Sequence, residues 1–321
     1  MSLPRIAIVG ATGAQGGGLV RALLTDPQPR FAPVALTRKP QSPAATALAA
    51  QGVAVQGADL DDEASLARAF EGVHGVFAVT NFWEHFSPEK ELAQAGNIAS
   101  AARHAGVRHL VWSTLEDTRR KVPLDDPRMP TLMGRYKVPH LDAKGEANEL
   151  FRAAGVPTTF MYTSFYWDNL IHFGMAPQRL PGGELAFTLP MDDARLPGIA
   201  ATDIGACAAG LFARGENVLG REIGIAGEHL SGAEMAQALS RALGEPVRHH
   251  AMAPADYAKQ GFPGADDLAN MFQYKRDFNA AFCALRPVQA TRALHPGLLD
   301  FAGWLARHSG ALRVEPAAQA V

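Results

Sequence analysis

The chain has 321 residues, 47% of them hydrophobic, which is enough to bury the core of one large domain or of two closely packed ones. Its 30 basic and 32 acidic residues give a formal net charge of −2, so we expect no direct nucleic-acid partner. Two isolated cysteines, Cys207 and Cys283, exclude a disulfide framework and a cysteine metal cluster. A strand that begins by Ile6 leaves no room for a signal peptide, and no apolar run is long enough for a membrane span. We expect a cytoplasmic protein with no metal and no membrane partner.

The first half of the chain alternates short apolar segments with helical ones. We predict strands at residues 6–9, 34–37, 53–56, 75–79, 109–113 and 158–162, with helices at 17–24, 44–51, 64–70, 89–105 and 140–154. Strands spaced by helices predict a parallel, doubly wound sheet with right-handed crossovers, and almost wholly apolar strands are typical of a sheet covered on both faces. We therefore predict an α/β fold, with a Rossmann domain over residues 1–162.

The pattern changes after residue 163. A turn at 181–184 precedes a predicted strand at 185–189, a helix runs from 201 to 211, and small helical segments follow at 256–272. Ser231 and Glu234 have the spacing of a capping box at the start of another helix. We predict a smaller α+β lobe over residues 163–312, with some chain crossing back to the sheet and a ligand cleft between this lobe and the sheet. We expect the tail at 313–321 to be mobile.

The turn after the first strand carries the strongest functional signal. Gly10, Gly13 and Gly16 recur every third residue and remove the side chains that would keep a pyrophosphate away from the backbone. A helix that begins near Gln15 offers its N–H groups and a partial positive charge to the same anion. Glycines also serve turns that bind nothing, but the order of strand, turn and helix favours a dinucleotide site.

The end of the second strand indicates which dinucleotide the chain binds. An acid in this place usually selects NAD, whereas a base accommodates the extra phosphate of NADP. Arg38 follows the strand, and no acid is present there, so we predict NADP(H) as the cofactor. The alternative is that Arg38 and Lys39 form a solvated pair at a strand end. Asp59 and Leu60, after the third strand, are predicted to meet the adenine, although Asp59 could instead cap the next helix.

Several segments resemble the NmrA-like branch of the atypical short-chain dehydrogenases/reductases. The likeness is carried by residues 10–17, 37–38, 79–84, 113, 115–116, 140–146, 155–157 and, most distinctively, 261–272. The resemblance implies a Rossmann domain that binds NADP(H), a smaller C-terminal lobe and a homodimer. It also implies that the nucleotide can act as a signal that changes which regulatory protein partner is bound.

The resemblance also implies roles for single residues. Gly10, Gly13, Gln15 and Gly16 match the phosphate loop, Arg38 the 2′-phosphate contact, Asn81 the ribose lining and Lys144 the contact to the nicotinamide ribose. We predict Thr12, Ala14 and Thr80 as further cofactor-binding residues beside them.

The catalytic pattern of this superfamily is incomplete. Typical members use a serine together with a tyrosine and a lysine that are four residues apart on one helix. Ser113 and Lys144 are present, but His140 stands where the tyrosine belongs, and Tyr136 is two turns from Lys144, beyond Pro139. His140 could act as a general acid, yet the Lys144 cation one turn away disfavours a second positive charge. The alternatives are that His140 is a hydrogen-bonding wall of the cleft and that Ser113 satisfies backbone groups.

Two functions stay open at this point. The intact nucleotide loop without the tyrosine favours an NADP(H)-responsive regulator, which we place narrowly first. The retained Ser113 and Lys144 favour an NADPH-dependent reductase of a small, apolar quinone-like or conjugated carbonyl compound, with water as the proton source. Aromatic residues after the fourth and sixth strands could line a substrate pocket, fill the core or form an interface: Phe82, Trp83, Phe165, Tyr166 and Trp167.

Overall fold

The computed structural model describes residues 2–314, and the chain divides into two compact units. Unit 1 contains Met1–Arg120, Pro139–Thr163 and Ala201–Gly224, and unit 2 contains Lys121–Val138, Ser164–Ala200 and the chain from Ile225 onward. Most of the tail expected to be mobile, at 313–321, lies outside the described residues. Each unit therefore consists of segments that are far apart in the sequence.

Unit 1 contains a seven-stranded parallel sheet with the order β11-β6-β5-β4-β1-β2-β3. The strands are β1 (Arg5–Ile8), β2 (Ala32–Thr37), β3 (Ala54–Gly57), β4 (Gly75–Ala78), β5 (His109–Thr114), β6 (Thr158–Tyr162) and β11 (Glu222–Gly224). The order reverses between β1 and β4, so the switch point of a doubly wound sheet lies at the carboxyl ends of these two strands. The predicted α/β fold with a Rossmann-type parallel sheet is confirmed.

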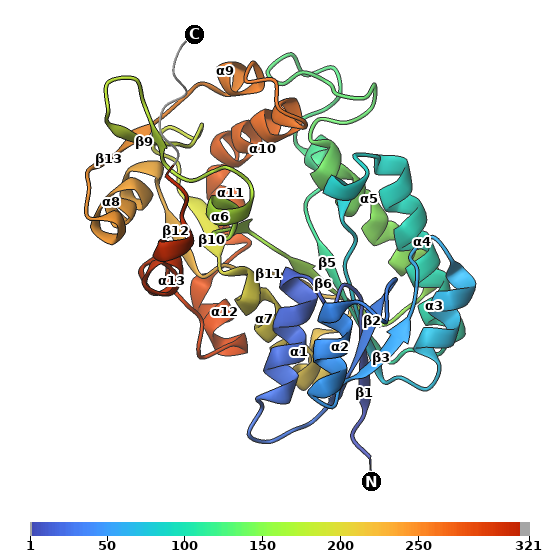
Figure 1. Cartoon of the computed structure of the whole chain (residues 1–321). Helices are drawn as coiled ribbons and strands as arrows, with labels where there is room; N and C mark the ends of the chain where they lie inside the picture. Colours follow the sequence, from blue (N-terminus) through green and yellow to red (C-terminus); the bar gives the residue numbers. More distant parts are fainter. Residues whose placement is uncertain (1, 315–321) are drawn as a thin grey trace. The chain divides into compact units, whose positions relative to one another are not determined.

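Helices cover the sheet of unit 1 (Figure 1). They are α1 (Ala14–Leu24), α2 (Pro43–Ala50), α3 (Glu63–Phe70), α4 (Pro88–His104), α5 (Pro139–Ala154) and α7 (Ala201–Arg214), with short 3-10 helices η1 (Phe82–Glu84), η2 (Thr118–Arg120) and η3 (Gly215–Val218). Helix α1 packs against α7, while α4 packs against both α3 and α5. None of the described helices in either unit combines the length and apolar character that crossing a membrane requires.

The predicted elements of the first half agree with the structure to within three residues at their ends. The seventh strand, β11, was not predicted, because its three residues contain a single apolar side chain, Ile223. It pairs in parallel with β6, so the second half of the chain completes the sheet of the first.

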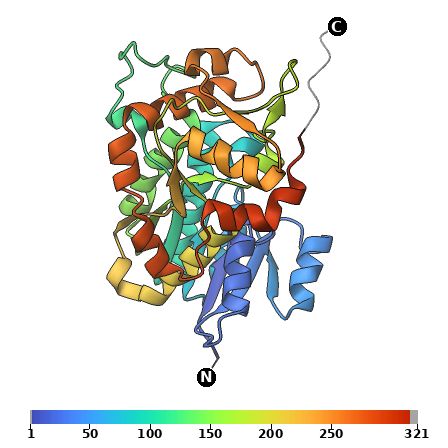
Figure 2. The same ribbon diagram turned by 90° about the vertical axis from the view of Figure 1, so that its left-hand side faces the viewer.

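Unit 2 contains two three-stranded sheets, with the orders β12-β10-β7 and β13-β9-β8. Their strands are β7 (Phe165–Tyr166), β8 (Gln178–Arg179), β9 (Leu185–Thr188), β10 (Leu196–Ile199), β12 (Glu228–Leu230) and β13 (Val247–His250). Its helices are α6 (Asn169–His172), α8 (Gly232–Leu243), α9 (Pro254–Ala258), α10 (Ala265–Asp277), α11 (Asn279–Ala284), α12 (Val288–Leu294), α13 (Phe301–His308) and the 3-10 helix η4 (Ser309–Ala311). Helices α8 and α13, light orange and red, lie side by side (Figure 2).

The predicted capping box at the start of α8 is confirmed. The Ser231 hydroxyl accepts a hydrogen bond from the Glu234 N–H at 3.2 Å, and the Glu234 carboxylate accepts one from the Ser231 N–H at 2.8 Å. The bond from the Ser231 N–H lowers the pKa of Glu234, since it stabilises the charged carboxylate.

Two glycines bring the backbones of α1 and α7 into direct contact. A Cβ atom at Gly205 would lie 2.0 Å from the Leu19 nitrogen and 2.5 Å from the Gln15 oxygen. A Cβ at Gly18 would lie 2.5 Å from the Thr202 oxygen. Gly18, in the glycine-rich segment after β1, therefore serves helix packing, a role that the sequence analysis did not assign to it.

A histidine lies in the interior of unit 1. His109 begins β5 and is 2% exposed, with its Nε2 atom 2.9 Å from the Thr159 hydroxyl and its ring 5.0 Å from that of Phe212. Burial and, to a smaller extent, the nearby His74 lower the pKa of His109 to about 4. The imidazole is thus neutral in the folded protein near pH 7.

The α1–α7 contact predicts the effect of Gly205→Ala. The added methyl group meets backbone atoms that cannot turn aside, so we expect a loss of about 2–3 kcal/mol in the free energy of unfolding. Gly96→Ala is the matched control, because its Cβ would approach Leu150 at an ordinary 4.0 Å, and alanine favours helix by up to about 1 kcal/mol. Urea unfolding of both variants checks this, and equal stability would contradict the contact.

His109 predicts how stability responds to acid. The unfolded chain binds a proton at this residue below about pH 6.5, whereas the folded protein does so only near pH 4, so falling pH favours unfolding across this window. We expect His109 to account for about 3 kcal/mol of stability lost between these pH values. His109→Gln should flatten the pH dependence of urea unfolding, whereas His104→Gln, at an exposed site, should leave it unchanged.

Candidate functional site

The glycine-rich turn after β1 packs tightly against the start of α1. Gly10 has a φ of 65°, in the left-handed region that glycine adopts without strain, and its oxygen accepts a hydrogen bond from the Gly13 N–H at 2.8 Å. A Cβ atom at Gly16 would lie 2.4 Å from that same Gly10 oxygen. Thr12 and Ala14, beside Gly13, are exposed. The turn therefore presents accessible backbone at the N-terminus of a helix.

This helix end differs from its neighbours in how it is capped. Helices α2, α3 and α4 are capped by the side chains of Ser42, Asp62 and Ser87. The N-cap residue of α1 is Gly13, and within the described residues no side chain makes that capping bond. The first N–H groups of a helix lack intrahelical acceptors and carry its partial positive charge, so this end is suited to an anion.

Ser113 connects the end of β5 to the first turn of α1. Its hydroxyl, which is buried, donates a hydrogen bond to the side-chain oxygen of Gln15 at 2.8 Å. The predicted serine and the predicted phosphate-loop glutamine thus lie in direct contact. Ser113 does not serve as a simple backbone cap, and it positions Gln15 at the switch point of the sheet.

The end of β2 carries an exposed ion pair. The Nη1 atom of Arg38 lies 2.7 Å from the Oε1 atom of Glu84, and the two side chains are 57% and 48% exposed. The hydrogen bond from Glu84 raises the pKa of Arg38. An exposed pair of this kind is weak, so the guanidinium can exchange Glu84 for another anion.

Asp59 and Leu60 follow β3 at the same edge of the sheet, and both are half-buried. The Asp59 carboxylate accepts a hydrogen bond from the Asp61 N–H at 3.0 Å. The cap of α3 is Asp62, whose carboxylate accepts from the Ser65 N–H at 3.2 Å. The alternative that Asp59 caps this helix is therefore wrong, because the helix begins three residues later than that role requires.

Lys144 lies in a closed, buried cluster at the end of β4. Its Nζ atom lies 3.0 Å from the Thr80 carbonyl oxygen, 2.7 Å from the Thr80 hydroxyl and 2.5 Å from the Oε1 atom of Glu91. The Thr80 hydroxyl donates to the same Glu91 oxygen. The ammonium also lies 5.3 Å from the centre of the Trp112 ring. The lysine expected at the ribose is thus held by Thr80, which follows β4, and by Glu91 of α4.

Glu91 is the residue of this cluster that the sequence analysis missed. It is fully buried, in the first turn of α4. A signal was present, because Glu91 continues the apolar stripe of Ala95, Ile98 and Ala102 at helical spacing. A charge on the buried face of a helix requires a partner, and the partner is Lys144.

His140 packs among aromatic rings in the first turn of α5. It is 6% exposed, and its ring centre lies 4.8 Å from that of Trp83 and 6.1 Å from that of Phe82. Asn81, which precedes η1, is exposed beside this cluster. The residue in the tyrosine position therefore contributes to an apolar, aromatic wall.

The five aromatic residues singled out in the sequence fall in different units. Phe82 and Trp83 lie in unit 1, whereas Phe165, Tyr166 and Trp167 lie in unit 2. Trp167 is almost fully buried, with its ring centre 5.4 Å from that of Phe301. For Trp167, the alternative that it fills a core is confirmed.

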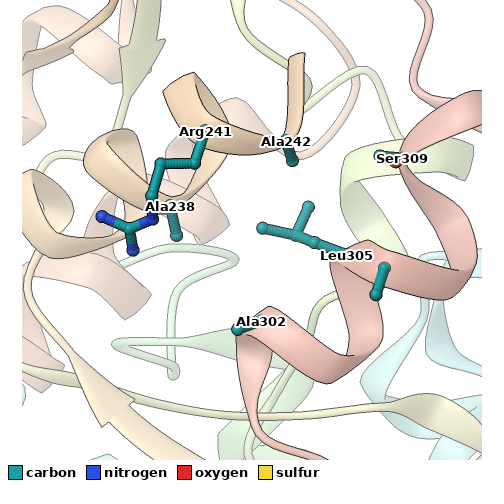
Figure 3. A pocket seen from close by; sticks show the side chains of 7 residues that line it. Ala238, Arg241, Ala242, Ala302, Leu305 and Ser309 are labelled. Carbon is teal, nitrogen blue, oxygen red and sulfur yellow. The ribbon is translucent and has the colours of Figure 1, made fainter. Parts of the chain in front are cut away.

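Unit 2 has a surface hollow of about 330 Å³ between α8 and α13 (Figure 3). It is lined by Ala238, Arg241, Ala242, Ala302, Leu305, Ala306 and Ser309. Arg241 is the charged residue of this lining, and none of the predicted site residues belongs to it. Among residues 2–314, no cluster of three or more His, Cys, Asp or Glu side chains is arranged to hold a metal ion.

Sequence comparison finds known proteins that are similar to this chain. The profile of the NmrA-like family matches residues 3–305. The NAD(P)H azoreductase of Xenophilus azovorans is 32% identical over 259 residues, which cover 81% of this chain and 80% of that protein. Quinone oxidoreductase 2 of Escherichia coli is 27% identical over 83% of this chain and 85% of its own length. The nitrogen metabolite repression protein nmr of Neurospora crassa is 28% identical over 59% of this chain and 37% of its own length.

Solved structures share the fold. The negative transcriptional regulator NmrA in complex with NADP superimposes with a TM-score of 0.76 at 23% identity, over 95% of both chains. The NADPH-dependent quinone oxidoreductase of Escherichia coli, complexed with NADPH, gives a TM-score of 0.70 at 24% identity, over 94% of this chain and 99% of that one. At these identities the likeness establishes the architecture.

Proposed function

This chain belongs to the NmrA-like family, and we propose on that premise that unit 1 binds NADP(H) at the carboxyl edge of its parallel sheet. Open sheets bind ligands at their switch point, which here lies between β1 and β4. The residues expected to bind the nucleotide follow the ends of β1, β2, β3 and β4 or lie on α5 at this edge: Gly10, Thr12, Gly13, Ala14, Gln15, Gly16, Arg38, Asp59, Leu60, Thr80, Asn81 and Lys144.

The geometry of the glycine turn fits a diphosphate. The contact between Gly16 and the Gly10 oxygen brings the start of α1 against the turn, and Gly13 leaves its backbone open. Arg38 supplies a cation at the adenosine end, where it forms an exposed pair with Glu84. In this arrangement Arg38 would hold the 2′-phosphate of NADP in place of Glu84.

We propose that the chain is an NADPH-dependent reductase of flat, conjugated compounds such as azo dyes, quinones or enones. The observation that carries this choice is the likeness to the NAD(P)H azoreductase, at 32% identity over four-fifths of both chains. On this support we propose the reductase ahead of the regulator, which the sequence analysis narrowly preferred. NADPH, when bound, would supply the hydride and water the proton, so reduction of such a compound would not require the missing tyrosine.

The side chains of unit 1 suit this role. Trp83, half-buried beside His140, provides an aromatic surface on which a flat substrate can stack. Lys144 contributes a fixed positive charge that stabilises negative charge developing on a substrate. Its N–H groups are engaged by Thr80 and Glu91, so it acts through its charge.

A second candidate is a regulator that responds to NADP(H). The observation in its favour is the likeness to the nitrogen metabolite repression protein, although this covers 59% of the chain. The Ser113–Gln15 and Lys144–Glu91 contacts, which engage the candidate proton donors inside the protein, are compatible with binding that ends in signalling. If the chain is a regulator, we propose in addition that it forms a homodimer and binds a protein partner.

Turnover distinguishes the two functions. Purified protein is mixed with NADPH and a panel of azo dyes, quinones and enones, and the absorbance of the reduced nicotinamide is followed. The reductase predicts steady oxidation that falls about a hundredfold in Lys144→Ala, because an electrostatic stabiliser is removed. No oxidation, together with tight binding of NADP(H) and a nucleotide-dependent change of oligomer by size-exclusion chromatography, would support the regulator instead.

Arg38→Asp tests the choice of nucleotide. The substitution removes the 2′-phosphate contact, worth about 1.5–3 kcal/mol, so we expect NADP affinity to fall about ten- to a hundredfold while NAD binding is kept. Calorimetric titration with both nucleotides measures this. Lys39→Asp is the matched control, since it makes the same change of charge at the next exposed base and should alter the ratio little. An unchanged ratio in Arg38→Asp would refute the assignment.

A further inference from the structure

A buried acid lies at the centre of the proposed site. Glu91 is fully buried in α4, and one of its oxygens contacts both the Thr80 hydroxyl and the Lys144 ammonium. Its other oxygen faces the Nε2 atom of His85 at 3.6 Å. Burying a carboxylate is unfavourable unless a cation and hydrogen bonds compensate for the lost water. The compensation here comes from Lys144 and Thr80.

The contacts with Thr80 and Glu91 also occupy the hydrogen-bond donors of Lys144. An ammonium group has three N–H donors, and Nζ of Lys144 lies within bonding distance of three acceptors on Thr80 and Glu91. The side chain is 11% exposed and lies over the Trp112 ring. The position of Lys144 is thus determined by the residue Thr80 after β4, by α4 and by β5, as well as by its own helix.

His85 does not replace Lys144 as the counter-charge of Glu91. Its Nδ1 atom accepts a hydrogen bond from the Ser87 N–H at 3.0 Å, so the ring proton is on Nε2, facing Glu91. Burial lowers the pKa of His85, which keeps the ring neutral near pH 7. The other charges acting on His85 are Lys90, Glu84 and Asp61, and His140 lies one turn from Lys144 on α5.

We infer that Glu91 is a positioning residue for Lys144: its carboxylate fixes the ammonium at the end of β4 and keeps it cationic beside the bound nucleotide. The inference rests on the proposed NADP(H) site. In the absence of a catalytic tyrosine, Lys144 carries the positive charge of this part of the site, and Glu91 maintains that charge at a place largely shielded from water.

Glu91→Gln tests the inference because it keeps the size and one acceptor but removes the counter-charge. The buried ammonium then becomes an unpaired cation, which releases its proton more readily as the pH rises. We expect NADP affinity, measured by calorimetry from pH 6.5 to pH 9, to change less than about twofold in the parent protein. In Glu91→Gln it should match the parent at the acidic end and fall about tenfold at the alkaline end.

Two further variants serve as controls. Glu89→Gln removes an exposed acid from the same turn of α4, and its affinity should follow the parent at every pH. In the Lys144→Met background, Glu91→Gln should add no pH dependence, because Glu91 acts through Lys144. A pH profile in Glu91→Gln identical to that of the parent, with binding intact, would overturn the inference and leave the proposed function standing.

A second measurement does not depend on the nucleotide. In ¹⁵N-lysine-labelled protein without ligand, the Nζ signal of Lys144 should titrate at lower pH in Glu91→Gln than in the parent. If the parent does not bind NADP(H), the proposed function fails, and this titration still decides whether Glu91 controls Lys144. Should Glu91→Gln not fold, Glu91→Asp is the alternative, because it keeps the negative charge but moves it away from the Lys144 ammonium. If the Lys144 signal and the NADP affinity of Glu91→Asp equal those of the parent, the inference is refuted.

Discussion

Helix α1 is held by backbone contacts that only glycine permits. On one side, Gly16 lets the helix begin against the Gly10 oxygen, and on the other, Gly18 and Gly205 let α7 cross at backbone distance. The first contact exposes the uncapped helix end at the switch point of the sheet. The second joins α7, which comes from beyond residue 200, to the unit that contains the turn. The anion site that we propose depends on both, because a displaced α1 would carry its N-terminus away from the turn.

The two cations of the proposed site differ in their surroundings. Arg38 pairs with Glu84 in water, where such a contact is weak and readily exchanged. Lys144 pairs with Glu91 away from water, where separating the charges is unfavourable. The adenosine end therefore has an exchangeable partner suited to recognising an additional phosphate, whereas the other end has a permanent charge. This division matches a dinucleotide whose adenosine end selects between NADP and NAD and whose nicotinamide end reacts.

Local pattern was sufficient to predict much of the fold and the elements of the candidate site. The alternation of apolar strands and helices identified six of the seven strands of the sheet, and spacing identified the capping box of Ser231 and Glu234. Three features escaped the sequence analysis. Strand β11 is too short to carry a pattern, and Gly205 acts through the distant α1. Glu91 lies on an apolar stripe, which marks it as a buried charge, but its partner Lys144 is distant in sequence. Asp62 was passed over as the α3 cap because Asp59 precedes it in the same acidic turn.

The short segment from Asn81 to Ser87 contacts three parts of unit 1 at once. Trp83 packs on His140, Glu84 pairs with Arg38, and His85 faces Glu91. These three neighbours belong to different elements of the sheet edge, yet the residues that meet them are consecutive. A substitution at Trp83, Glu84 or His85 that shifts the backbone of this segment would therefore also alter the contacts of the other two residues.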